Sequence, residues 1–282
     1  MPTFQNYATV SYHGQTAVSN LVTGEITASL RMTKTAVAET YEQGGRVTYA
    51  LSILNSGGSE LSGLTLSDDL GAYPFGEQTL TPLDYVTGSA QLFINGELQS
   101  SPTVAAGPPL RITDLSIPAD GNAIVLYTAE ANAYAPLLAD SEITNTATLS
   151  GNGITDVTAT DAIAPEYAVK LRIVKTIQPT TVRENGVIAY SFRIMNHGGL
   201  PAEADGNVSV NDTFDPILKD ITVTLNGQSL NNTQYNYNVA SGEFSTVPGI
   251  ITVPAATFIR DPVSGVWTQS PGETTLTVSG RV

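Results

Sequence analysis

One block of sequence occurs twice in this chain, and the spacing within its two copies constrains the fold. LRMTKTA begins at residue 30, and LRIVKTI begins at residue 171. Lys34 precedes Tyr49 by 15 positions, and Lys175 precedes Tyr190 by the same 15 positions. An Asn follows each of these Lys residues after 21 positions. Fixed spacing of this kind indicates two copies of one structural unit.

Further matches extend the repeat along both copies. Three pairs of segments correspond: LTLSDDL at 64–70 with VSVNDTF at 208–214, FINGEL at 93–98 with LNGQSL at 225–230, and PADGNAIVLY at 118–127 with PGETTLTVSG at 271–280. The first pair aligns Asp68 with Asp212. The repeat therefore predicts two domains, at residues 30–164 and 165–282.

The closing segment of the first copy has a counterpart at the start of the chain. ITNTATLSGNGITDVTATDAIA at 143–164 and FQNYATVSYHGQTAVSNLVTGEI at 4–26 share the frame N-x-A-T, an apolar residue and Ser, followed by a Gly-containing turn. The second copy reaches Val282 before any such hairpin. We therefore expect residues 1–29 to be a hairpin that closes a second-copy domain. Its candidate donor residues are Phe4, Asn6, Ala8, Val10, Val18, Leu21, Val22 and Ile26.

Short alternating segments separated by turn residues predict an all-β fold. Apolar residues recur at every second position in segments such as 47–54, 123–129 and 188–195. Asn-Gly and Asp-Gly pairs accept positive φ and favour tight hairpins. Such pairs stand at 95–96, 120–121, 185–186 and 226–227. We expect two tandem immunoglobulin-like Greek-key β-sandwiches, preceded by the hairpin as a donor-strand extension.

Composition argues against several classes of function. The net charge is −14, from 12 basic and 26 acidic residues, whereas nucleic acids and anionic membranes bind basic patches. Cys is absent, so disulfides and thiolate chemistry are excluded. We find no segment long enough to span a membrane and no classical signal peptide after Met1. His13 and His197 are expected in solvated loops, and no phosphate loop, Ser-His-Asp set or His-based metal motif is present, so we expect no cofactor, no metal and no enzymatic activity.

A sandwich that lacks its last strands leaves a sheet edge unpaired, and such edges recruit strands from other chains. We predict that residues 4–26 insert into residues 165–282 of a neighbouring subunit, as in pilin donor-strand complementation. This contact is heterologous, so it builds an open head-to-tail filament unless its rotation closes a ring. Closure within one chain is disfavoured, because few residues link the hairpin to Leu30 and a complete domain intervenes.

The frame K-T-A … G-G-x-V-T-Y … N-S-G … L-S-D-D-L … I-T-N-T-A-T resembles a conserved repeat domain of bacterial surface proteins, known as domain of unknown function eleven. The resemblance covers Leu30–Ala164 closely and Leu171–Val282 more loosely. It implies an immunoglobulin-like sandwich in an exported or surface assembly. The chain is also similar to Gram-positive pilin and adhesin domains that join a first-strand Lys to a last-strand Asn by an isopeptide bond, assisted by an acid in mid-domain.

That similarity implies candidate bond-forming residues in the first copy: Lys34, Asp68 and Asn145. Burial lowers the pKa of a Lys, so that the amine can attack, and raises the pKa of a carboxyl group, so that the acid can polarise the Asn carboxamide. In the second copy Lys175 and Asp212 match, and the corresponding Asn is Asn6 of the hairpin. A bond between Lys175 and Asn6 would join two subunits.

These motifs also have structural interpretations. Lys34 could be exposed or form an ordinary salt bridge with Asp68, and the Asn before T-A-T could cap a turn or bind backbone groups. The acidic pairs Asp68–Asp69 and Glu203–Asp205 could bind Ca²⁺. They lack the alternating spacing of a calcium loop, so we expect solvated turn carboxylates.

The sequence therefore predicts a structural subunit of an extracellular bacterial filament, at the cell surface or the spore surface, whose partner is a second copy of itself. The rival hypothesis is a monomeric surface adhesin or a glycan-binding stalk fragment of a longer repeat protein, with residues 1–29 as the cut end of an upstream repeat. Trp267, Tyr235 and Tyr237 could line a glycan site in that protein, although we favour a core role for them. The adhesive target is not indicated by any motif.

Overall fold

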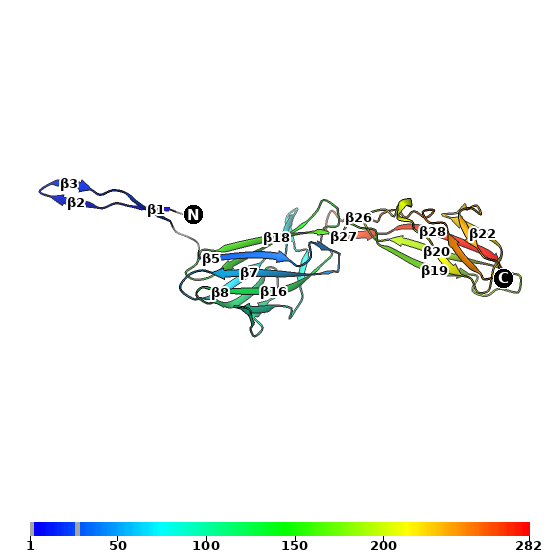
Figure 1. Ribbon diagram of the computed structural model, residues 1–282, viewed down its shortest axis with the longest axis horizontal. Coiled ribbons are helices and arrows are strands. Elements are labelled where there is room, and N and C mark those ends of the chain that lie inside the picture. The colour runs from blue at the N-terminus through cyan, green and yellow to red at the C-terminus, as the bar shows by residue number, and fades with distance from the viewer. Residues whose placement is uncertain (1–2, 26–28) are drawn as a thin grey trace. The chain divides into compact units, whose positions relative to one another are not determined.

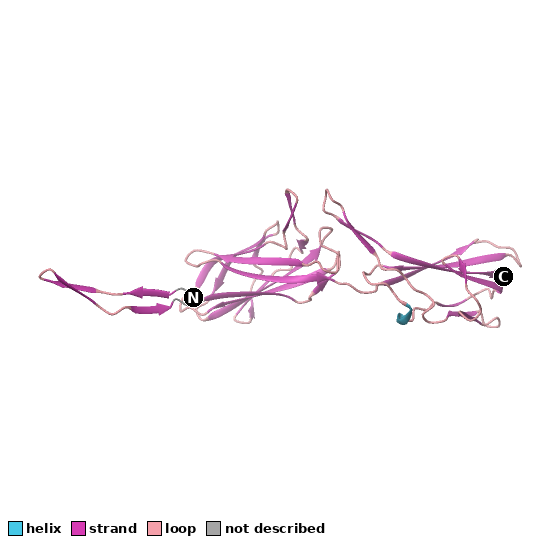
Figure 2. Ribbon diagram, turned by 90° about the horizontal axis from the view of Figure 1, so that it is seen from above, coloured by secondary structure: helices cyan, strands magenta, loops and turns pink. Residues whose placement is uncertain are grey.

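The computed structural model describes residues 3–25 and 29–282. The regular secondary structure of the described part consists of β-strands, with one 3-10 turn, η1 (Ala204–Gly206) (Figure 2). Contacts divide the chain into two compact units, residues 1–132 with 143–163 and residues 133–142 with 164–282. No helix in these described residues is long and apolar enough to cross a lipid bilayer.

The N-terminal residues form a two-stranded ribbon, drawn in blue in Figure 1. Its strands are β1 (Thr3–Asn6), β2 (Thr9–Tyr12), β3 (Gln15–Val18) and β4 (Val22–Glu25). β2 pairs with β3 about a turn at His13 and Gly14, whose φ angles of 48° and 81° suit a tight hairpin. Two residues separate β1 from β2, and three separate β3 from β4. The second strand of the ribbon therefore carries a one-residue bulge.

Two six-stranded sheets form the first sandwich. One sheet has the order β13–β12–β16–β7–β5, with β11 also paired to β16. Its strands are β5 (Leu30–Ala36), β7 (Arg46–Asn55), β11 (Leu83–Tyr85), β12 (Gln91–Ile94), β13 (Glu97–Leu98) and β16 (Gly121–Ala131). The other sheet has the order β14–β15–β8–β17–β18–β6. Its strands are β6 (Thr40–Tyr41), β8 (Leu61–Asp68), β14 (Thr103–Ala105), β15 (Leu110–Ile117), β17 (Ile143–Ser150) and β18 (Val157–Pro165), and a separate hairpin joins β9 (Tyr73–Phe75) to β10 (Gln78–Leu80).

The closing hairpin β17–β18 completes the core of the first sandwich. β17 pairs with β8 on one side and with β18 on the other. Alternate residues of β17 point inward and are at most 2% exposed: Ile143, Asn145, Ala147 and Leu149. β5 shows the same alternation, with Leu30, Met32, Lys34 and Ala36 buried. Period-2 patterning thus places one face of each strand in the core.

The second sandwich has a five-stranded sheet of order β19–β20–β28–β22–β23 and a three-stranded sheet of order β21–β25–β24. The strands of the larger sheet are β19 (Leu171–Gln178), β20 (Val187–Asn196), β22 (Lys219–Leu225), β23 (Gln228–Ser229) and β28 (Gly272–Arg281). The smaller sheet contains β21 (Asn211–Thr213), β24 (Tyr235–Tyr237) and β25 (Glu243–Thr246), and a further hairpin joins β26 (Thr257–Arg260) to β27 (Trp267–Ser270). Phe192, Phe214 and Leu276 belong to its buried core.

The predicted all-β fold with two immunoglobulin-like sandwiches and an N-terminal extension is confirmed. The alignment of 118–127 with 271–280 is wrong by two residues. Tyr127 lies opposite Tyr49, whereas Val278 lies opposite Tyr190, so Val278 is the counterpart of Tyr127. The shift arises because Pro118 lies three residues before β16, while the proline before β28 adjoins the strand directly.

Candidate functional site

Lys34 and Asp68 form a buried ion pair in the first sandwich. Lys34 points inward from β5, and its Nζ donates to Oδ2 of Asp68, at the end of β8, over 2.6 Å. The two side chains are 0% and 1% exposed. Oδ1 of Asp68 accepts the backbone N–H of Leu70 at 3.0 Å, which fixes the orientation of the carboxylate. The Lys34 ammonium also lies 4.8 Å from the centre of the Tyr49 ring.

Asn145 joins this pair through a tyrosine hydroxyl. The hydroxyl of Tyr127 donates to Asp68 Oδ2 at 2.7 Å and accepts a hydrogen bond from Asn145 Nδ2 at 3.0 Å. Asn145 Oδ1 accepts the backbone N–H of Gly71 at 3.2 Å. Because a backbone N–H can only donate, this contact assigns the two ends of the Asn145 carboxamide.

The structure thus brings Lys34, Asp68 and Asn145 into one hydrogen-bonded cluster. Sequence reasoning missed Tyr127 and Gly71 as members of it. The apolar run IVLY at 124–127 is a sequence signal for a buried strand that contains Tyr127, and the structure places Tyr127 on the fully buried face of β16. Gly71 gives no such signal, because its contact depends on a loop with a φ of 72° at that residue.

Burial controls protonation in the cluster. Desolvation lowers the pKa of Lys34 below its ordinary 10.5, and this effect exceeds the opposing attraction of Asp68, Asp69 and Asp161. Desolvation also raises the pKa of the Tyr127 phenol well above its ordinary 10, and the adjacent Asp68 adds to that shift. The Lys34 ammonium therefore gives up its proton more readily than an exposed lysine, while the Tyr127 phenol keeps its own.

Lys175 and Asp212 form the matching ion pair of the second sandwich. The Lys175 ammonium lies 4.6 Å from the centre of the Tyr190 ring and 5.6 Å from that of Phe214. The two charged side chains are 40% and 17% exposed, in contrast to the fully buried pair of the first sandwich. Asn6, the third candidate, is exposed on β1 and lies opposite Val22 of β4.

The inner face of β19 is uncovered. All eight of its residues are exposed, although its sequence repeats that of β5. Leu171 and Ile173 are 40% and 55% exposed, while their counterparts Leu30 and Met32 are 7% and 8% exposed. The first sandwich covers this position with its closing hairpin, whose Asp161 accepts the backbone N–H of Ala36 on β5 at 2.6 Å.

The neighbouring strand β21 has a free edge. It pairs with β25 on one side, and none of the strands described pairs with its other side. Its counterpart β8 pairs there with β17. Between β19 and the segment that leads into β21 lies an apolar groove of about 190 Å³. Its lining residues are Leu171, Arg172, Ile173, Ile194, Val208, Ser209 and Val210.

The ribbon and the hairpin β17–β18 have the same strand register at their matching Asn residues. Asn6 lies opposite Val22 as Asn145 lies opposite Asp161. Phe4 lies opposite Gly24, and its ring packs over that glycine. A Cβ at residue 24 would lie 2.3 Å from the Phe4 ring, so this contact requires glycine.

The other donor candidates fall on different parts of the ribbon. Val10 lies opposite Ala17, and Val18 lies opposite Thr9, on the other face of the ribbon from Val10. Ala8 and Leu21 lie outside the ribbon strands and are exposed, as is Val22. Ile26 lies outside the described residues.

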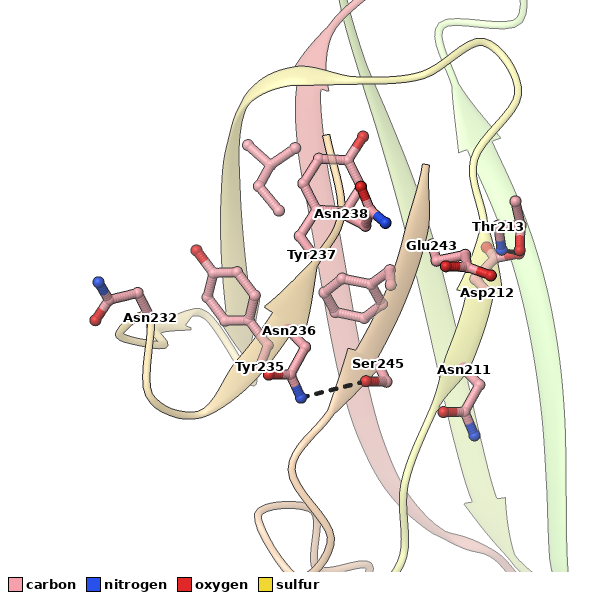
Figure 3. A pocket seen from close by; sticks show the side chains of 12 residues that line it. Asn211, Asp212, Thr213, Asn232, Tyr235, Asn236, Tyr237, Asn238, Glu243 and Ser245 are labelled. Atoms are coloured by element: carbon pink, nitrogen blue, oxygen red, sulfur yellow. Dashed lines mark hydrogen bonds between the residues drawn. The ribbon is translucent and has the colours of Figure 1, made fainter. Parts of the chain in front are cut away.

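A second hollow, of about 990 Å³, lies over the sheet β21–β25–β24 (Figure 3). Asn211, Asn236 and Ser245 line one side of it, with Asn236 donating to the Ser245 hydroxyl at 3.4 Å. Tyr237 turns its hydroxyl to the backbone of Leu218. Trp267 is 8% exposed and so belongs to the core rather than to a glycan platform.

Metal binding has no geometric support within residues 3–25 and 29–282. No group of three or more His, Asp and Glu side chains is placed to hold an ion. Asp69 instead accepts the backbone N–H groups of Gly71 and Thr146, each at 2.9 Å. This carboxylate therefore shapes the loop that follows β8.

Comparison with known proteins found similarity to solved structures only. No protein family model and no curated protein matches this chain. The chain is similar to BcpA, the major pilin subunit of Bacillus cereus, at 11% identity and a TM-score of 0.37 over 98% of this chain and 74% of that one. It is also similar to the pilus backbone RrgB of Streptococcus pneumoniae, at 12% identity and a TM-score of 0.35 over 86% and 55% of the two chains. The collagen-binding domain of a Staphylococcus aureus adhesin matches at 12% identity and a TM-score of 0.31 over 49% of this chain and 99% of that domain. Similarity at this level assigns neither a family nor a function.

Proposed function

We propose that the chain is a structural subunit of an extracellular bacterial filament, in which the ribbon of one subunit completes the second sandwich of the next. The observation that carries the proposal is the exposed inner face of β19 beside the free edge of β21. A half-exposed apolar strand next to an unpaired edge is an acceptor for strand addition. The same positions in the first sandwich are filled by β17–β18, whose sequence the ribbon repeats.

The first sandwich supplies the register of the docked ribbon. Ala147 pairs with Asp68 and Leu149 with Leu66. Transferred to the second sandwich, this register pairs Ala8 with Asp212 and places Val10 opposite Val210. Val210 lines the apolar groove beside β19. Docking would then bury the apolar residues of β19 and of the donor strand together, which is the favourable term in such an association.

The same register would place Asn6 beside the Lys175–Asp212 pair. In the first sandwich the corresponding Asn145 lies in the cluster of Lys34 and Asp68. Attack of the Lys amine on the Asn carboxamide would release ammonia and leave an amide bond. We propose this bond between Lys34 and Asn145 within each subunit, and between Lys175 and Asn6 across each junction. Bonds at both places would give a chain without disulfides a covalent path along the filament.

Electron microscopy of the purified chain tests the assembly, and a variant that lacks residues 1–28 is the control. The full chain should form filaments whose repeat is one subunit, and the truncated chain should stay monomeric. A monodisperse monomer from the full chain would contradict the proposal and favour the adhesin hypothesis.

The covalent bonds need a separate test, because strand exchange does not require them. Boiling in denaturant should leave ladders of the wild type, and intact mass should show the loss of one ammonia for each bond. Asn6→Ala should dissolve the ladders into monomers while retaining the loss of ammonia at Asn145. Ladders of Asn6→Ala that survive boiling would show that the Asn6 assignment is wrong.

A further inference from the structure

We propose that the Tyr127 hydroxyl is the proton relay for bond formation between Lys34 and Asn145, and that the second sandwich lacks this relay. The inference rests on the isopeptide chemistry of the proposed function. It assigns to Tyr127 direct contact with the nitrogen that leaves as ammonia, since Asn145 Nδ2 donates to the Tyr127 oxygen at 3.0 Å.

The hydrogen bonds form one continuous path from nucleophile to leaving group. Lys34 Nζ donates to Asp68 Oδ2, and Tyr127 donates to the same oxygen, at 2.6 and 2.7 Å. Among the hydrogen bonds of the described residues, none joins Asp68 directly to the Asn145 carboxamide. A proton taken from Lys34 by Asp68 therefore reaches the Asn145 nitrogen through the phenol.

The reaction balances along this path. Asp68 removes a proton from the Lys34 ammonium, and the free amine attacks Cγ of Asn145. In the tetrahedral intermediate Tyr127 passes its own proton to the amide nitrogen and takes the first proton from Asp68. The Asp68 carboxylate, ionised again, then accepts the second proton from the Lys34 nitrogen. The Cγ–N bond breaks and ammonia leaves. The products are the Lys34–Asn145 amide, ammonia and a protonated Asp68, so charge and hydrogen are conserved.

The other end of the Asn145 carboxamide is held in the geometry that such an attack requires. The backbone N–H of Gly71 donates to Oδ1 at 3.2 Å, where negative charge develops in the intermediate. Backbone donors at that position stabilise an oxyanion. A Cβ on Gly71 would lie 2.4 Å from Ile143, so the close approach depends on glycine.

The second sandwich has a stacked aromatic pair beside its Lys, but it lacks a hydroxyl at the position of Tyr127. The ring of Phe214 stacks on Tyr190 at 5.0 Å, whereas in the first sandwich Tyr127 stacks on Tyr49 at 5.4 Å. Val278 stands opposite Tyr190 on the strand position that Tyr127 occupies opposite Tyr49. The junction bond therefore forms more slowly than the bond within the first sandwich, and each subunit becomes rigid before its junction becomes permanent.

Cell-free synthesis of the full chain, followed by intact mass at intervals, tests the relay. Wild type should lose one ammonia promptly at Asn145 and a second, later, in assembled material. Tyr127→Phe keeps the ring and should slow the first loss roughly a hundredfold or more, the usual contribution of a positioned proton donor. Tyr85→Phe is the matched control, because its hydroxyl accepts the Ala90 N–H at 3.2 Å and lies outside the path.

Two failures are distinguishable in this experiment. If wild type never loses ammonia, the isopeptide chemistry of the proposed function fails, and the relay fails with it. If wild type loses ammonia and Tyr127→Phe does so equally fast, the relay alone is wrong. Thermal unfolding of Tyr127→Phe in an Asn145→Ala background should fall below that of Asn145→Ala alone only by the loss of the hydrogen bond to Asp68, because the ring stays in place. A large loss of stability there, together with slow bonding, would assign Tyr127 a packing role and overturn the relay.

Discussion

If the ribbon docks into a neighbouring subunit, substitutions of Val10 on the donor strand should weaken or abolish assembly. Val10 is 67% exposed in the ribbon, and its counterpart Leu149 is 0% exposed in the completed first sandwich. Docking would therefore take the Val10 side chain out of water. Val10→Ala removes two buried carbons at about 0.8 kcal/mol each, which gives about 1.6 kcal/mol per junction. Since 1.4 kcal/mol is a factor of ten, the dissociation constant of a junction should rise roughly tenfold.

Val10→Asp should abolish assembly, because an unpaired charge in an apolar groove costs several kcal/mol. Sedimentation velocity over a range of concentrations measures both variants, in an Asn6→Ala background that keeps the junction free of the proposed bond. Gln5→Asp is the control, since Gln5 is the counterpart of Thr144, which is exposed in the first sandwich. Unchanged polymers of Val10→Asp, or equal losses in Gln5→Asp, would refute the reasoning.

Three further predictions concern the first sandwich. Asp68→Ala leaves the Lys34 ammonium buried without its partner. The variant should have a free energy of unfolding lower by roughly 3–5 kcal/mol in urea titration, and it should not lose ammonia. An Asp68→Ala variant as stable as the wild type would contradict the buried pair. Gly71→Ala should lower the melting temperature clearly, because φ is 72° and the new Cβ would lie 2.4 Å from Ile143, whereas Gly76→Ala, whose φ is 58° with nothing within 4 Å, shows the cost of strain alone. Asn145→Ala cannot form the bond, and in this variant desolvation holds the pKa of Lys34 below 10.5. The unfolded chain then binds the Lys34 proton more tightly than the folded chain does, so the free energy of unfolding should rise with pH below 10.5. Titrations from about pH 8 to about pH 10 that show no rise attributable to Lys34, by comparison with Lys34→Met, would contradict the lowered pKa.

The sequence predicted the β-sandwich fold from its repeat spacing and alternation, and it named Lys34, Asp68 and Asn145 as candidates through the resemblance to isopeptide-forming pilin and adhesin domains. Period-2 alternation places Lys34 and Asn145 on the inner faces of β5 and β17, and the repeat identifies the acid between them. Tyr127 was missed because strand register, which depends on pairing with β7, decides what it contacts. Gly71 was missed because a loop contact leaves no periodic signal. The bulge in the ribbon, which places Val18 and Val10 on opposite faces, was also not predicted, because it is set by the pairing of β2 with β3.

Complementation between two disabled variants tests the central claim most directly. One variant carries Val10→Asp and keeps its acceptor groove, and the other carries Ile173→Asp in the groove and keeps its ribbon. Each variant alone should sediment as a monomer. An equimolar mixture should give a dimer and nothing larger, because one intact ribbon meets one intact groove. A mixture that stays monomeric, or either variant polymerising alone, would contradict the account.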